Sequence, residues 1–543
     1  MLAAILSAAA LAAAPTVIDL QSAPTTIAVS ERVSLTALST GASRWLVLRV
    51  DGRAHHLEIA DPAGVTVDMT AANTGAIEVL DAAGRARCAP WEGSPSPLDA
   101  AAASPDAYSP LCGGRLWLRK DMKGRRSPLE WSVERVRDNW KRGEQLTELA
   151  KRTVFRDRYM EVARTGGDAP MVQGPGAPPA LSLKPSDRTR TLAAPNLDIP
   201  LLGDHGTMPA GRWAPSTSRG VWVSAVTPGM VAVDPEVSAP GALDPVESKA
   251  LALLVAFDLT EFNVDFEVGT EHPRVSWSER APSHLQPAGG GGPDGFDTLA
   301  PLTRTGQVAP WEVGLLTATF TGGFKRSHGA FKSGPYAVRN LGSHYGFMQD
   351  GVVLSTLQPG LATLVVERDG RVDVRVWAEG DSPQGLRHAR QNGVPLVSRS
   401  EDGVSRAGAF VHQWGPGNWS GSAEGQLRSL RAAACVVEAP DRRYLIYGWF
   451  STATPRAMAQ VLLATGCTNA MLLDMNALEH TYLATYTPGP GGTPVPHHVD
   501  SGMAVLDKSG RNGEPLPRFV ALPDNRDFFL ILRKDPTTRE AAP

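Results

Sequence analysis

The chain has 543 residues, too many for a single hydrophobic core, and this length predicts two or three domains. Its formal net charge is only −3, so charge provides no argument for binding nucleic acid or an anionic membrane surface. Glycine (54 residues) and proline (44 residues) are both abundant, which favours a β-rich body with turns and linkers over a helical bundle.

The N-terminal residues 1–14 form a run rich in alanine and leucine, with small residues at which a signal peptidase could cut. The run is too short to span a bilayer and is typical of the apolar region of a secretory signal, although the usual basic residues before it are missing. A buried strand or helix is the alternative. We expect export to the periplasm, the cell envelope or the exterior. No later run reaches about 18 consecutive apolar residues, so we expect no transmembrane span.

Residues 25–80 alternate apolar and polar positions in short runs. The run at 45–50 (WLVLRV) is followed by Asp51-Gly52 and by a second run at 55–59 (HHLEI). Asp-Gly between two such runs is a strong hairpin signal. We therefore predict a small all-β domain over residues 15–125, with an accessory or adhesive role rather than a catalytic one.

The four cysteines fall into two groups, Cys88 with Cys112 and Cys435 with Cys467. Four cysteines allow three connectivities, and we expect the two local pairs, which fits an exported protein. In a cytosolic protein they would instead be four buried thiols. None of them has CxxC spacing, so we do not expect a zinc site.

The region 126–217 is predicted to contain a helical segment and then a linker. Apolar residues recur there at roughly helical spacing between many Arg and Lys residues: Leu129, Trp131, Val133, Val136, Trp140, Leu146, Leu149 and Val154. This pattern predicts one or two amphipathic helices docked on a neighbouring domain, with contact to an anionic surface as the alternative. Residues 165–216 are rich in Gly, Pro and Ala, which indicates an extended linker.

The region 218–543 begins with strand-like runs such as residues 250–257 (ALALLVAF). The glycines at 289–292 indicate a surface loop and match no phosphate-binding loop. Further on, Thr454, Pro455 and Gly466 are suited to the N-cap, the first turn and the C-terminal end of a helix. The apolar run 470–473 after this helix predicts a buried strand that ends at Asp474.

Several segments of this region resemble the phosphodiester glycosidase family. Residues 315–320 lead into Thr321-Gly322-Gly323-Phe324, which is similar to the family's Asn-Gly-Gly-Phe/Tyr-Phe motif. Residues 473–478 (LDMNAL) stand where the family has Leu-Asp-Gly-Gly-Gly-Ser. Further similar segments, in the family's order, are 345–351 (YGFMQDG), 389–397 (ARQNGVPLV), 429–435 (SLRAAAC) and 444–450 (YLIYGWF).

The sequence also departs from the family pattern. Thr321 replaces the family's Asn, the Asp-Gly expected near residues 444–450 is absent, and the triple glycine after Asp474 has become Met-Asn-Ala. Some divergent bacterial members of the family share the Leu-Asp-x-Asn ending and a Gly-Phe-Lys…His-Gly segment. The resemblance therefore implies a distinct subfamily with an altered substrate.

The resemblance implies an α/β (α+β) domain over residues 218–543, with a mixed sheet and packed helices. It implies hydrolysis of a glycosyl phosphodiester in an envelope or extracellular glycan. The alternative is a non-catalytic carbohydrate- or envelope-binding protein with the same fold, and a third reading places the function in the N-terminal domain. The expected partner is a glycan or sugar phosphodiester, with no nucleic acid. We predict no cofactor and leave a divalent-metal requirement open.

Such a reaction needs carboxyl groups for proton transfer and donors that hold the phosphate. The catalytic candidates implied by the resemblance are Asp474, Arg431, Glu479 and His328. The candidates for binding substrate or phosphate are Thr321, Gly322, Gly323, Asn476 and His480.

These candidates also have structural interpretations. The glycine pair can form a bulge, Arg431 can form a structural ion pair, and His328 can lie in an exposed loop. Glu479 and His480 would point to opposite faces if they lay on a strand. The group His497, His498 and Asp500 is favoured as a surface loop over a metal cluster.

Overall fold

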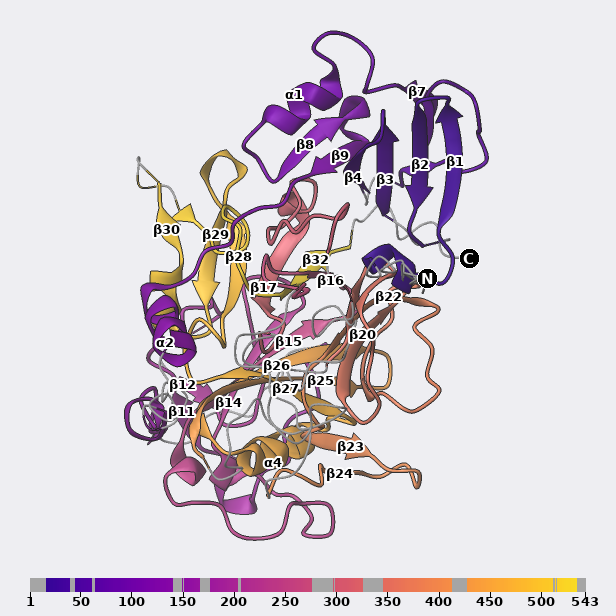
Figure 1. Cartoon of the computed structure of the whole chain (residues 1–543). Helices are drawn as coiled ribbons and strands as arrows, with labels where there is room; N and C mark the ends of the chain where they lie inside the picture. Colours follow the sequence, from indigo (N-terminus) through magenta and orange to yellow (C-terminus); the bar gives the residue numbers. More distant parts are fainter. Residues whose placement is uncertain are drawn as a thin grey trace, which may run out of the picture.

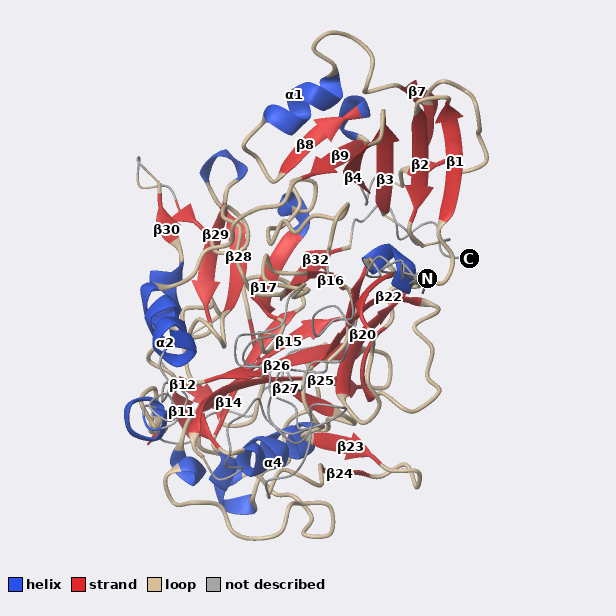
Figure 2. Ribbon diagram, in the orientation of Figure 1, coloured by secondary structure: helices blue, strands red, loops and turns tan. Residues whose placement is uncertain are grey.

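The structure is a computed structural model (Figures 1 and 2). It describes residues 16–39, 44–60, 64–139, 149, 151–166, 176–203, 207–275, 296, 298–325, 345–412, 427–510, 513 and 515–534. The predicted signal segment and the glycines at 289–292 lie outside these residues. No helix in the described part of the chain is long and apolar enough to cross a membrane.

The described chain is mostly β, with 40% strand and 13% helix, and its named strands form seven sheets. The prediction of an α/β (α+β) domain with a mixed sheet and packed helices is therefore wrong. The apolar runs are strands buried on both faces, as in parallel sheets, but the ladders between the named strands are antiparallel. Both faces are covered mainly because sheets pack on one another, which gives a β-sandwich-like class.

The N-terminal part is a β unit with its own apolar core, at the top of Figure 1. Its strands are β1 (Thr25–Ser30), β2 (Val33–Ala37), β3 (Trp45–Val50), β4 (Arg53–Ile59), β5 (Thr66–Val67), β6 (Ile77–Asp81), β7 (Gly84–Cys88), β8 (Tyr108–Leu111) and β9 (Leu116–Arg119), with helix α1 (Pro97–Ala103). The sheets run β1-β2-β3-β4-β9-β8 and β5-β6-β7. The predicted hairpin is confirmed, since Val50 pairs with Arg53 around Asp51-Gly52, and Cys88 is bonded to Cys112.

The connecting region differs from the expected amphipathic helices and linker. Helix α2 spans Pro128–Asn139, yet Trp131 is 50% exposed and Val136 37% exposed, so these two residues of the predicted apolar set do not lie on a buried face. The short strands β10 (Arg164–Gly166), β11 (Thr191–Ala193) and β12 (Thr207–Pro209) form a sheet. Leu192 and Trp213 belong to the main core, so this part of the Pro/Gly-rich segment is packed structure.

Three larger sheets make up the body. The eight-stranded sheet contains β13 (Ala214–Pro215), β14 (Val221–Val226), β15 (Ala252–Asp258), β26 (Arg443–Ala453), β25 (Ser429–Glu438), β27 (Ala470–Met475), β23 (Val397–Arg399) and β24 (Ser405–Ala407), in that order. A five-stranded sheet contains β16 (Phe262–Glu267), β32 (Phe528–Arg533), β17 (Leu316–Thr321), β28 (Leu483–Pro488) and β29 (Pro494–His498). A second contains β19 (Val352–Ser355), β18 (Phe347–Gln349), β22 (Leu386–Gln391), β20 (Ala362–Glu367) and β21 (Val372–Val376), and β30 (Lys508–Ser509) pairs with β31 (Pro515–Leu516).

Helix α4 (Pro455–Thr465) lies near β25 and β27 in Figure 1 and leads directly into β27. Its predicted ends are confirmed: the Ala457 N–H donates to the Thr454 hydroxyl, and Gly466 is left-handed with φ 91°. Cys467, immediately after the helix, is bonded to Cys435 on β25. Both predicted local disulfides are therefore present, and they are compatible with export into an oxidising compartment.

Candidate functional site

The two sequence motifs meet in space. The Thr321 hydroxyl, at the end of β17, donates to the His480 carbonyl at 2.7 Å. Asn392 provides a second connection, because it accepts the Phe324 N–H at 3.0 Å and donates to the Leu472 carbonyl at 2.5 Å. The ends of β17 and β27 are thus held together by hydrogen bonds, and we call the charged side chains at this junction the motif cluster: Asp474, Glu479, His480, Glu130, Lys325 and Arg526.

Asp474 is a buried carboxyl, 3% exposed, near the end of β27. Its Oδ2 lies 2.6 Å from Nη1 of Arg526, and its Oδ1 accepts the Met475 N–H at 2.7 Å. Nδ1 of His480 lies 3.9 Å from the same Oδ1. Burial raises the pKa of Asp474, against the opposing effects of His480 and Arg526.

Glu479 and His480 contact each other in a turn rather than alternating on a strand, so the condition under which they would point to opposite faces does not apply. Nε2 of His480 lies 3.4 Å from Oε1 of Glu479, and its Nδ1 lies 2.7 Å from the Met475 carbonyl. Burial acts to raise the pKa of Glu479, but the hydrogen bond and charge of His480 outweigh it and lower that pKa to about 2. Two neighbouring carboxyl groups therefore have pKa values shifted in opposite directions, an arrangement suited to acid and base roles.

Glu130, Lys325 and Arg526 were missed by the sequence analysis. Oε1 of Glu130 lies 2.6 Å from Nζ of Lys325 and 3.0 Å from Nη2 of Arg526. Lys325 follows the Gly-Gly-Phe motif directly, which is a signal that could have identified it. Glu130 comes from α2, and nothing in its local sequence connects it with a motif about 190 residues away.

The two glycines of the first motif have structural roles. The Gly322 N–H donates to the Asp527 carbonyl at 2.7 Å, so this N–H is engaged within the fold. Gly323 has φ +135°, and a Cβ atom there would lie 2.8 Å from Asn392. Only glycine fits this turn without displacing Asn392.

Asn476 turns the chain away from β27. Its φ is +79°, and its N–H donates to the Leu430 carbonyl at 2.8 Å. Its side-chain Oδ1 is buried without a hydrogen-bond partner in the structure. Asn476 is thus a non-glycine residue in the left-handed region two positions after Asp474, a conformation that Asn adopts more readily than most residues.

Arg431 is not brought into the motif cluster. It is the cross-strand partner of Met475, so it shares the face of Met475, whereas Asp474 points to the opposite face. Its guanidinium donates to the carbonyls of Ala453 and Leu427, each at 2.9 Å. Burial lowers the pKa of Arg431 to about 9, with Glu247 opposing the change. Its role in holding phosphate stays a prediction that these contacts do not support.

Of the other histidine predictions, one can be placed in the structure. His328 lies outside the described residues. His498 lies on β29 and is 2% exposed, with Nε2 2.8 Å from Oδ2 of Asp507, so a surface loop is wrong for this residue. Asp500 accepts the Gly502 N–H at 2.8 Å and begins a short turn.

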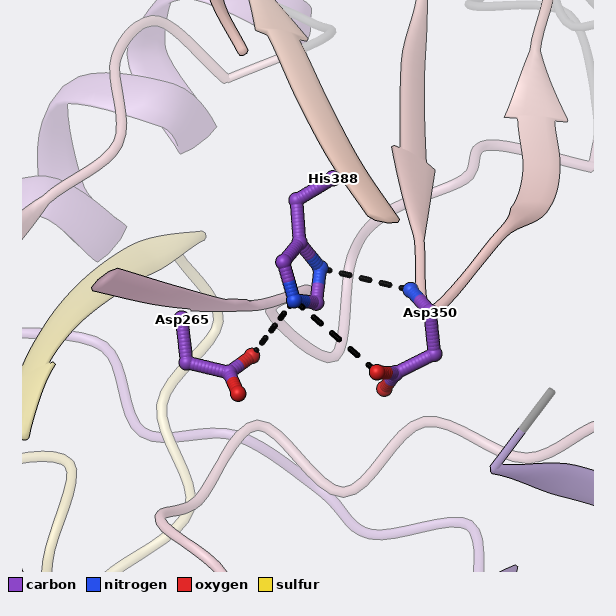
Figure 3. Close-up of side chains that lie close together, drawn as sticks. All are labelled: Asp265, Asp350 and His388. Atoms are coloured by element: carbon purple, nitrogen blue, oxygen red, sulfur yellow. Dashed lines mark hydrogen bonds and ion pairs between the residues drawn. The ribbon is translucent and has the colours of Figure 1, made fainter. Parts of the chain in front are cut away.

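Within the described part of the chain, one group of side chains is close enough to hold a metal ion. It comprises Asp265, Asp350 and His388, whose ligand atoms lie within 4.8 Å of one another (Figure 3). The Asp350 N–H donates to Nδ1 of His388 at 3.3 Å, which leaves the proton of a neutral ring on Nε2. Nε2 faces Oδ1 of Asp265 at 2.9 Å, a close contact that is not aligned as a hydrogen bond. A metal on Nε2 of a neutral ring would place the ring proton on Nδ1, where it would face the Asp350 N–H.

Arginines neutralise the same carboxylates. Nη2 of Arg387 lies 2.9 Å from Asp265, and Nε of Arg387 lies 3.3 Å from Asp350. Arg44 adds contacts at 3.4 Å to Asp265 and 3.3 Å to Glu312. The group therefore does not fit a cation site and is part of a larger ion-pair network.

This network joins the N-terminal sheet to the body. Arg119, at the end of β9, pairs with Glu58 on β4 and lies 2.9 Å from Glu267 on β16. We call it the interdomain network, and its charged members are Arg44, Glu58, Arg119, Asp265, Glu267, Glu312, Asp350, Arg387 and His388. These contacts indicate that the interdomain network holds the N-terminal sheet on the body.

A surface hollow of about 690 Å³ lies elsewhere on the body. It is lined by residues 369–372 and 438–443 together with Leu259, Thr260 and Lys534. These are turns between strands, and no member of the motif cluster lines the hollow. It is therefore separate from the candidate site.

A comparison with models of protein families and a comparison with curated proteins found no match. Among solved structures, the chain is similar to a hypothetical protein from Synechocystis, with 10% identity and a TM-score of 0.22, over 92% of this chain and 97% of that one. It is also similar to a protein of Burkholderia pseudomallei K96243 that is described as exported, with 12% identity and a TM-score of 0.20, over 97% of this chain and 99% of that one.

Proposed function

We propose that the protein hydrolyses a glycosyl phosphodiester of an envelope or extracellular glycan, with the motif cluster as its site. The observation that carries this proposal is the meeting of Thr321 with the Asp474–His480 segment, since the sequence resemblance rests on these two segments. The opposite pKa shifts of Asp474 and Glu479 support it further.

The proposed roles follow from these environments. Asp474, whose pKa is raised, donates a proton to the phosphate oxygen that leaves the anomeric carbon. The ionised carboxylate of Glu479, held by His480, accepts a proton from the water that attacks that carbon. The products are a free sugar and a phosphate monoester, so the proton taken from water balances the proton given to the leaving group.

The test is hydrolysis of a panel of sugar 1-phosphodiesters by the full chain, with Asp474→Asn and Glu479→Gln beside it. Loss of a general acid or base lowers kcat by about 10²- to 10⁴-fold, so each variant is expected to lose activity on that scale. Turnover that neither substitution changes would assign the reaction to another site.

Asp258→Asn is the matched control. Asp258 is also a buried carboxylate, 1% exposed and paired with an arginine, Arg442, but it lies at the end of β15 outside the motif cluster. The control is expected to lose stability and to keep kcat. Circular dichroism on all three variants separates loss of fold from loss of chemistry.

A non-catalytic carbohydrate- or envelope-binding protein is the second candidate. It is favoured by the engagement of both Asp474 oxygens and by the burial of Met475, which is 1% exposed. Glycan binding by the wild-type chain without turnover of any phosphodiester would select this function.

A further inference from the structure

Helix α2 directs a charged side chain into the protein. Among the side chains that the structure describes on α2, Glu130 is buried and 6% exposed, whereas Trp131, Ser132, Arg135 and Val136 face solvent. A surface helix ordinarily buries its apolar residues and exposes its charges. The buried side chain among those described is thus a charged one, and it needs partners within the protein.

The Glu130 carboxylate is surrounded by side-chain donors from the body. Nζ of Lys325 lies at 2.6 Å, Nη2 of Arg526 at 3.0 Å and Nδ2 of Asn525 at 3.5 Å. Lys325 is 1% exposed and Arg526 is fully buried. Two buried cations next to an amide donor make a strong site for an anion.

Both donors have partners outside α2, and for Lys325 this partner is Glu271, whose Oε2 lies 3.4 Å from Nζ of Lys325. The Arg526 N–H donates to Oδ1 of Asp524 at 2.9 Å, and its Nη1 is held by Asp474. A Cβ atom at Gly269 would lie 2.4 Å from the Arg526 backbone, so this turn packs tightly on its neighbour. The anion site therefore belongs to the rigid body, and α2 supplies the anion.

We propose that Lys325 and Arg526 form an anion-binding subsite for the phosphoryl group of a ligand, and that Glu130 occupies it as an internal competitor. Arg526 also contacts Asp474, so a bound phosphoryl group would lie beside the carboxyl assigned as acid. This inference rests on the proposed function for the identity of the whole ligand, but the subsite itself requires only an oxyanion.

Ser127 connects the start of α2 to the same cluster. Its hydroxyl accepts the Glu130 N–H at 3.0 Å. A ligand that displaces Glu130 therefore disturbs the start of α2 as well. The release of α2 is an observable consequence of anion binding.

The test uses inorganic phosphate as the probe and the full chain, by isothermal titration calorimetry at constant ionic strength in chloride. Glu130→Gln removes the competing charge and keeps the shape of the side chain. While Glu130 occupies the subsite, the apparent affinity for phosphate is reduced in proportion to the fraction of molecules in which the subsite is free. We therefore expect phosphate to bind at least about tenfold more tightly to this variant than to the wild type.

Two further variants check the assignment. Glu58→Gln also removes a buried carboxylate partner of an arginine, Arg119, but in the interdomain network, and it is expected to leave phosphate affinity unchanged. Adding Lys325→Met to Glu130→Gln is expected to abolish the gain. Equal affinity in the wild type and Glu130→Gln, or a gain that survives Lys325→Met, would overturn the proposal.

Hydrogen exchange of the wild type replaces calorimetry if Glu130→Gln does not fold. Phosphate, compared with chloride, is expected to speed amide exchange of residues 128–139, and unchanged exchange would overturn the subsite. The two proposals fail separately. Tighter phosphate binding by Glu130→Gln without turnover of any phosphodiester supports the subsite and contradicts the hydrolase. Turnover with equal phosphate affinity in the wild type and Glu130→Gln supports the hydrolase and contradicts the subsite.

Discussion

The interdomain network and the motif cluster are both networks of buried charge, and their compositions differ. The interdomain network contains five carboxyl groups and three guanidinium groups: Glu58, Asp265, Glu267, Glu312 and Asp350 with Arg44, Arg119 and Arg387. The motif cluster joins carboxyl groups to Arg526, Lys325 and His480 at the ends of strands from two sheets.

The excess of carboxyl groups distinguishes the interdomain network. Burial raises the pKa of Glu58 to about 7, and it also raises the pKa values of Glu267 and Glu312. Burial also acts to raise the pKa of Asp265, but Arg387, His388 and Arg44 outweigh it and hold that pKa well below its ordinary value. Opposed shifts therefore occur in this network as well as at Asp474 and Glu479 in the motif cluster. Neither buried charge nor opposed shifts alone mark an active site, and the reason to expect chemistry in the motif cluster is its place where the two motif segments meet.

The largest effect is expected from Arg526→Met. This change leaves the buried carboxyl groups of Asp474 and Glu130 without their shared cation, and breaking a buried ion pair costs about 3–5 kcal/mol. Urea denaturation at neutral pH measures the loss in the free energy of unfolding.

Arg119→Met is the matched variant in the interdomain network, because Arg119 likewise bridges two buried carboxyl groups. The decrease in the free energy of unfolding caused by Arg119→Met is expected to be smaller below pH 7 than above it. The reason is that Glu58 can take up a proton when Arg119 is absent. Equal losses for both variants at every pH would contradict the difference drawn between the networks.

A slightly smaller effect concerns pH. The pKa of Glu58 rises from its ordinary value of 4.5 to about 7 in the folded state. Protonation of Glu58 therefore contributes to the free energy of unfolding. This contribution is fully present below pH 4.5 and is lost as the pH rises through 7. For a group shifted this far, the loss is on the order of 3 kcal/mol.

Glu58→Gln removes this titration. Its free energy of unfolding is expected to fall less than that of the wild type between pH 4.5 and 8, as measured by urea denaturation at each pH. A wild-type curve that is flat over this range, or a variant curve as steep as the wild type, would show that the network does not hold the proton.

The smallest of the three effects is expected from Gly323→Ala, in the turn that leads from Thr321 to Lys325. The φ of +135° and the contact with Asn392 at 2.8 Å predict a loss of about 2 kcal/mol. Gly314→Ala, where a Cβ atom meets nothing within 4 Å, is expected to change stability by less than about 1 kcal/mol. Similar melting temperatures for the two variants would show that the turn can relax.

Local patterns predicted local structure well. Asp51-Gly52 specified its hairpin because Asp and Gly adopt the two successive left-handed conformations of this turn with little conformational strain. Thr454 and Gly466 specified the ends of α4, and the cysteines paired with their neighbours in sequence. In each case the interacting groups are close along the chain.

The errors arose where partners are distant. The family resemblance implied an α/β domain, and the apolar runs could not correct it, because burial on both faces looks the same in sequence whether helices or another sheet cover the strand. Trp131 and Val136 were assigned to a buried face, although α2 is held through Glu130.

The sequence by itself determined the turns, the helix ends, the disulfide pairs and the two motif segments that supply Thr321 and Asp474. Only the tertiary structure decided that Glu130, Lys325 and Arg526 surround this junction and that Arg431 lies on the other face of the sheet. The physical reason is that a turn or a cap depends on neighbouring residues, whereas the partner of a buried charge is chosen by how distant strands and helices pack.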